Sequence, residues 1–78
     1  MAVTAFVLIE TAVGKTRDVS ESLNGLQGLV SVDMVTGPYD IIAVIEAEDL
    51  KSIGRSVTQN IHTISAIQRT VTCLALGN

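Results

Sequence analysis

Residues 30–47 read VSVDMVTGPYDIIAVIEA, two apolar runs separated by a five-residue break. The break, TGPYD at 36–40, contains the only proline, Pro38, and the only tyrosine, Tyr39. β-Branched and apolar residues dominate both runs, as is typical of strands. Because the runs are so close in the chain, we predict an antiparallel hairpin of strands 29–35 and 41–47 joined by this turn.

A strand and a helix precede the hairpin. Residues 3–11, VTAFVLIET, are apolar with only weak alternation, which is typical of a strand buried on both faces. In residues 15–26 the period changes, because Val19, Leu23 and Leu26 are spaced as one stripe of a helix.

A second helix and a last strand follow the hairpin. Asp49 is a suitable N-cap, and an apolar stripe then runs to a helix end near His62 through Leu50, Ile53, Val57 and Ile61. Gly54 weakens this helix, and we expect it to mark a close packing contact. Residues 66–76, AIQRTVTCLAL, form the last strand, with one face made of Ile67, Val71, Cys73 and Ala75.

The order β-α-β-β-α-β is that of the ferredoxin-like fold. We therefore predict an α+β domain over residues 1–78, with a four-stranded antiparallel sheet and two helices on one face. Two helices cover only one face, yet the strands carry apolar residues on both. The uncovered face needs an apolar partner, and a second copy is the simplest one. We predict a dimeric αβ sandwich, with a larger ring as a further option.

Composition excludes several classes of protein. Cys73 is the only cysteine and His62 the only histidine, so we expect neither a disulfide nor a metal site nor a bound cofactor. The net charge is −3 and the five basic residues are scattered, which disfavours direct binding of nucleic acid. The sequence shows no secretion signal and no membrane-length apolar stretch, which favours a cytoplasmic location.

The turn itself allows two interpretations. In the first, Gly37 and Pro38 set the turn dihedrals and Asp40 caps the backbone of the turn. In the second, a glycine backbone, a phenol and a carboxylate form a pocket for a small zwitterion such as a free amino acid. No catalytic triad, P-loop or dinucleotide fingerprint is present, so we predict no catalytic residue and no enzyme.

The run from TGPYD through IIAVIEAEDL to QRTVTCLAL resembles the effector-binding domain of the Lrp/AsnC, or feast/famine, family of regulators. The G-x-Y/F-D turn of that family is matched by Gly37, Tyr39 and Asp40. An R-T entry to the last strand is matched by Arg69 and Thr70. The likeness covers essentially the whole chain.

The resemblance implies a domain that dimerises through its sheets, assembles into rings, commonly octamers, and binds free amino acids between dimers. It implies ligand-binding roles for Gly37, Tyr39, Asp40, Arg69 and Thr70. It also implies that an Asp40→Ala variant loses its ligand response and keeps its fold. Pro38 departs from the family pattern and removes one amide donor.

Regulators of this family carry an N-terminal helix-turn-helix domain, whereas this chain begins at its first strand. The resemblance thus implies a stand-alone effector domain in transcription regulation, able to co-assemble with a full-length Lrp/AsnC regulator. Two alternatives stay open at this point. The chain could be a fragment of a transcription factor. It could also be a small dimeric ferredoxin-like enzyme, a cofactor-free or haem oxygenase or isomerase, with His62 or Tyr39 as the reactive group.

Overall fold

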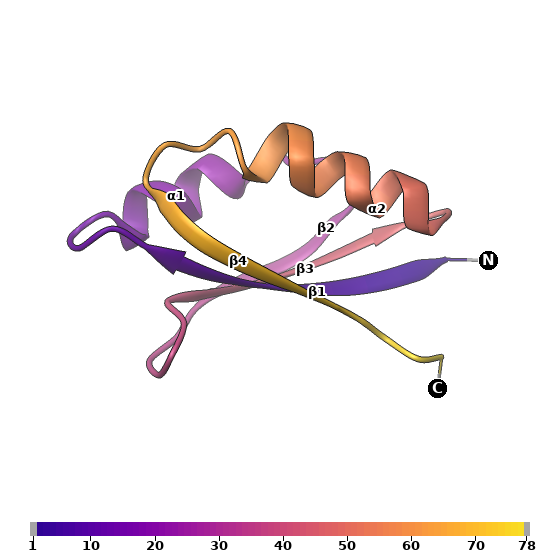
Figure 1. Cartoon of the computed structure of the whole chain (residues 1–78), viewed down its shortest axis with the longest axis horizontal. Coiled ribbons are helices and arrows are strands. Elements are labelled where there is room, and N and C mark those ends of the chain that lie inside the picture. Colours follow the sequence, from indigo (N-terminus) through magenta and orange to yellow (C-terminus); the bar gives the residue numbers. More distant parts are fainter. Residues whose placement is uncertain (1, 78) are drawn as a thin grey trace.

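The computed structural model describes residues 2–77 and has the predicted βαββαβ order (Figure 1). Its elements are β1 (Val3–Thr11), α1 (Thr16–Leu23), β2 (Leu29–Met34), β3 (Ile41–Ala47), α2 (Leu50–Ser56), the π-helical turn η1 (Val57–Ile61) and β4 (Ile67–Leu74). The first and third strands have the predicted bounds, and the hairpin of β2 and β3 is confirmed.

The four strands form one antiparallel sheet in the order β2-β3-β1-β4. The central strand β1 lies between β3 and β4, so that Val7 has Ala43 on one side and Thr72 on the other. Both helices cover the same face of the sheet (Figure 1). The predicted ferredoxin-like fold is therefore confirmed.

The core lies between this face and the helices, and it follows from strict alternation in the two central strands. The inward residues of β1 and β3 are buried, and they meet the predicted helical stripes. The resulting core is Ala5, Val7, Ile9, Val19, Leu23, Ile41, Ala43, Ile45, Ile53, Val57 and Ile61. The predicted cap of α2 is also confirmed, because the Asp49 carboxylate accepts a hydrogen bond from the Ser52 amide at 2.8 Å.

The expected packing contact at Gly54 is wrong. This residue is exposed, and a methyl group added there would meet nothing within 4 Å. The close approach is at Gly28, the residue before β2. Its φ of +84° lies in the left-handed region, and an added Cβ would lie 2.5 Å from the carbonyl oxygen of Glu46.

The predicted faces of the last strand need one correction. A register shift between Glu10 and Thr11 leaves an extra residue in β4, because Glu10 faces Arg69 and Thr11 faces Ile67. Ile67 consequently packs against the core, instead of sharing a face with Val71 and Cys73.

The other face of the sheet is covered by no helix in residues 2–77 (Figure 1). We call it the open sheet face. It is made of neighbouring side chains from the three strands β3, β1 and β4, namely Phe6, Leu8, Ile42, Val44, Val71 and Cys73. Phe6 is 39% exposed, an unusual environment for a phenylalanine at the middle of a sheet. Within residues 2–77, none of the helices has the length and hydropathy needed to cross a membrane.

Candidate functional site

The turn at 36–40 is closed by its own backbone and tied to the central strand. The Val35 amide donates to the Asp40 carbonyl, and the Asp40 amide donates to the Ile9 carbonyl, both at 2.9 Å. Gly37 has a φ of +139°, which favours glycine for the backbone conformation alone. Figure 1 shows the turn projecting from the end of the sheet, on the side away from the helices.

The Asp40 carboxylate points to the end of β1. Its Oδ2 atom accepts hydrogen bonds from the Thr11 amide at 2.9 Å and from the Thr11 hydroxyl at 3.3 Å. The Thr11 hydroxyl also lies 2.8 Å from that of Thr16, the first residue of α1. Asp40 therefore fastens the turn to the segment where β1 leads into α1, rather than capping the turn's own backbone.

Tyr39 and Arg69 are in direct contact. The guanidinium Nη2 donates to the Tyr39 hydroxyl at 2.8 Å, and its carbon lies 5.6 Å from the centre of the phenol ring. The hydrogen bond to Tyr39, and after it the charges of Tyr39 and Glu10, raise the pKa of Arg69. The guanidinium is thus a fixed positive charge at the rim of the open sheet face.

Glu10 is a functional candidate that the sequence alone did not single out. It lies opposite Arg69 in the register of β1 and β4, on the same face as Leu8 and Phe6. It was predicted to be only a strand-end position equivalent to Glu46. The ferredoxin-like order places the first and last strands side by side, and this was the signal that could have linked Glu10 to Arg69.

Thr70 lies on the other face of the sheet from Arg69, because neighbouring residues of a strand alternate. Its hydroxyl is 2.9 Å from Nε2 of His62, at the end of η1. The structure therefore brings Tyr39 and Arg69 together and adds Glu10, whereas Asp40 anchors the turn and Thr70 pairs with His62 on the helix side.

The comparison with known families follows from this fold and site. Residues 4–78 match the family model described as the Lrp/AsnC ligand binding domain. The chain belongs to this family, which confirms the resemblance stated above. The relatives are transcriptional regulators rather than enzymes, so the prediction of a non-enzymatic domain is confirmed and the oxygenase or isomerase alternative is set aside.

Two curated relatives come from hyperthermophilic archaea. An uncharacterised HTH-type transcriptional regulator of Pyrococcus horikoshii is 31% identical over 78 residues, and one of Pyrococcus furiosus is 30% identical. Each alignment covers 96% of this chain and 52% of the relative. The chain thus spans about half the length of the curated relatives it matches.

Solved structures with this fold include single-domain and longer proteins. FFRP-DM1 is 38% identical with a TM-score of 0.90, and the alignment covers 95% of this chain and 99% of that one. Escherichia coli AsnC is 23% identical with a TM-score of 0.91, covering 97% and 52%. A Neisseria meningitidis transcriptional regulator in complex with L-methionine is 16% identical with a TM-score of 0.85, covering 96% and 50%. The last two likenesses show the shared fold alone.

Proposed function

We propose that this chain is an effector-binding and oligomerisation domain that takes a free amino acid at the cluster of Tyr39, Arg69 and Glu10 and serves transcription regulation. The observation that carries the proposal is the contact between Arg69 and Tyr39 beside the carboxylate of Glu10. A positive group, a negative group and an aromatic wall lie together at the rim of an apolar face, and these are the parts that an amino acid requires.

The roles of the three side chains follow from their hydrogen-bonding capacity. Arg69 uses one N–H on Tyr39, and its remaining donors suit the carboxylate of the ligand. The carboxylate of Glu10 suits the ammonium group. The Tyr39 ring holds Arg69 in place and forms the wall. Gly37 keeps the backbone beside this wall free of a side chain, and Asp40 holds the turn against β1.

Assembly is the second part of the proposal. The open sheet face exposes apolar side chains from three strands, and the same face of a second copy has matching shape and chemistry. Pairing of two such faces would place the site at the rim of the dimer, where further copies complete a ring. The same face would allow co-assembly with a longer regulator of this family. The relative solved with L-methionine lends support to the amino-acid class of the effector.

Calorimetry of the intact oligomer with each of the twenty amino acids, at up to about 5 mM, tests the proposal. We expect binding of at least one amino acid. An Arg69→Gln variant should weaken it by about tenfold or more, since a hydrogen bond to a charged group is lost. Arg17→Gln, on the exposed face of α1, is the matched control and should leave affinity unchanged. Absence of binding by all twenty, or wild-type affinity in Arg69→Gln, would refute this site.

A further inference from the structure

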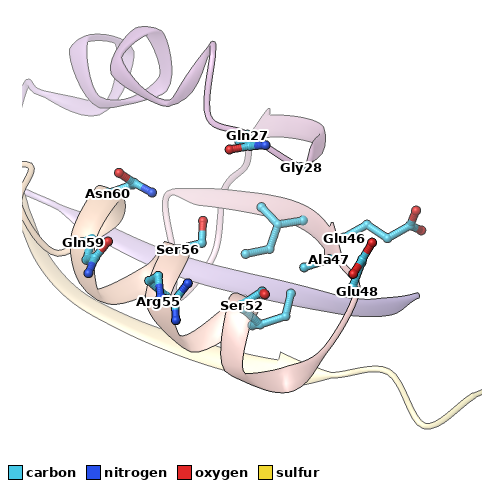
Figure 2. Close-up of a pocket in the computed structure, with 12 residues that line it drawn as sticks. Gln27, Gly28, Glu46, Ala47, Glu48, Ser52, Arg55, Ser56, Gln59 and Asn60 are labelled. Atoms are coloured by element: carbon cyan, nitrogen blue, oxygen red, sulfur yellow. The ribbon is translucent and has the colours of Figure 1, made fainter. Parts of the chain in front are cut away.

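A second concave surface lies on the helix-covered side of the domain. This interhelical groove has a volume of about 650 Å³ and runs between α2 with η1 and the loop of Gln27 and Gly28 (Figure 2). Its apolar lining comes from Ile45 and Ala47 of β3 and from Ile53 of α2. The groove lies at the end of β3 that is far from the turn at 36–40. None of the residues assigned above to the amino-acid site lines it.

One hydroxyl in the groove is left without a partner. The Oγ atom of Ser56 is buried and makes no hydrogen bond within residues 2–77. A serine in a helix commonly bonds the carbonyl oxygen four residues earlier, and buried hydroxyls are rarely left unpaired. Figure 2 shows this hydroxyl pointing from the helix into the space below Gln27. A small bound molecule would satisfy it.

The helix changes geometry where it borders the groove. Residues Val57–Ile61 form a π-helical turn, in which the His62 amide donates to the Val57 carbonyl at 2.9 Å. Such turns are rare and are frequently found at functional sites. Two side-chain amides from this turn, Gln59 and Asn60, line the groove beside Ser56 (Figure 2).

The charges around the groove favour an anion over a zwitterion. Arg55 is its one lining cation. The Glu46 carboxylate accepts a hydrogen bond from the Thr4 hydroxyl, at 3.4 Å, and is therefore turned to the open face of the sheet. Glu48 is exposed, and Figure 2 shows both carboxylates at one end of the groove, away from Ser56. An ammonium group beside Ser56 would thus find no anionic partner.

We propose that the interhelical groove binds a short aliphatic 2-hydroxy or 2-oxo acid. Arg55 holds the carboxylate, because a guanidinium donates two parallel hydrogen bonds to it. The Ser56 hydroxyl and the amide of Asn60 bind the oxygen at C2. The aliphatic chain lies on Ile45 and Ile53. This site is separate from the amino-acid site and stands independently of it.

Calorimetry of the intact oligomer with 2-oxoisovalerate and with L-lactate tests the proposal. We expect dissociation constants of about 1 mM or below. Ser56→Ala should weaken binding by about tenfold, and Arg55→Gln by about tenfold or more. Arg17→Gln, outside the groove, is the matched control and should bind as the wild type does. L-Valine, which differs from 2-oxoisovalerate at C2, should retain its affinity in Ser56→Ala, because its binding depends on the other site.

Two results would overturn the proposal. One is the absence of binding by both acids up to about 20 mM, which would mean that the groove holds water only. The other is wild-type affinity in both Ser56→Ala and Arg55→Gln. Loss of the fold does not confuse the test, because Ser56→Ala removes a buried unpaired hydroxyl and should keep or raise the melting temperature. The Arg69→Gln variant separates the two sites, since it should keep the affinity for the acids.

Discussion

The Asp40→Ala substitution distinguishes an anchoring role of this carboxylate from a ligand-binding role. In the structure, Oδ2 of Asp40 accepts the Thr11 amide and the Thr11 hydroxyl, and Thr11 is only 6% exposed. Removal of the carboxylate therefore leaves a buried amide without an acceptor. Loss of a charged acceptor from a buried donor costs about 2 kcal/mol of folding free energy.

Urea denaturation, followed by circular dichroism at one fixed protein concentration, measures this cost. For a domain of this size, about 2 kcal/mol lowers the midpoint of unfolding by about 2 M urea. Asp40→Asn keeps a carbonyl oxygen that can accept the Thr11 amide, so it should lose about 1 kcal/mol or less. Asp33→Ala removes an exposed carboxylate of β2 and should stay within about 0.5 kcal/mol of the wild type.

The opposite outcome would restore the role implied by the family resemblance. If Asp40→Ala unfolds within about 0.5 kcal/mol of the wild type, the hydrogen bonds to Thr11 contribute little and the reasoning is wrong. If that stable variant also fails to bind the amino acid that the wild type binds, Asp40 is a ligand contact. A less stable variant that still binds the amino acid when folded supports the anchoring role.

Three further predictions concern packing, capping and assembly. Gly28→Ala should cost about 3 kcal/mol or more in chemical denaturation, because it adds a clash to a left-handed backbone, whereas Gly54→Ala in the open should stabilise by about 1 kcal/mol. Asp49→Ala should lower the melting temperature at neutral pH. Hydrogen bonds lower the pKa of this carboxyl below 3.8, so its stabilisation is full above that pH and is lost at more acidic pH, where wild type and variant should converge. Val44→Lys on the open sheet face should give monomers in analytical ultracentrifugation, and Val13→Lys, on a fully exposed residue, should not.

The sequence was sufficient for the fold because local signals agreed with one another. The strands at 3–11 and 41–47 were predicted with their observed bounds, since runs of β-branched residues end at Gly14 and begin after the turn. The stripes of both helices and the Asp49 cap were also predicted correctly, because each depends on spacing within a few residues. The π-helical turn was not predicted, since it barely changes the period of the apolar stripe.

The site was less predictable because its contacts join distant parts of the chain. The partner of Asp40 is 29 residues away and that of Tyr39 is 30 residues away. Neither the pairing of Glu10 with Arg69 nor the bulge beside it leaves a local pattern in the sequence. Residue types alone therefore identified Tyr39 and Arg69 as candidates, whereas the strand register was needed to add Glu10 and to place Thr70 on the opposite face.

The extra residue in β4 has a consequence for how this strand can evolve. In a regular strand, Ile67 and Arg69 would share a face, so either the isoleucine would leave the core or the arginine would enter it. The bulge reverses the alternation between them. One short strand can therefore keep a fixed apolar residue inside while the nearby surface residue varies. Ligand preference can then change at Arg69 without a compensating change in packing, and deletion of Gln68 would remove this independence.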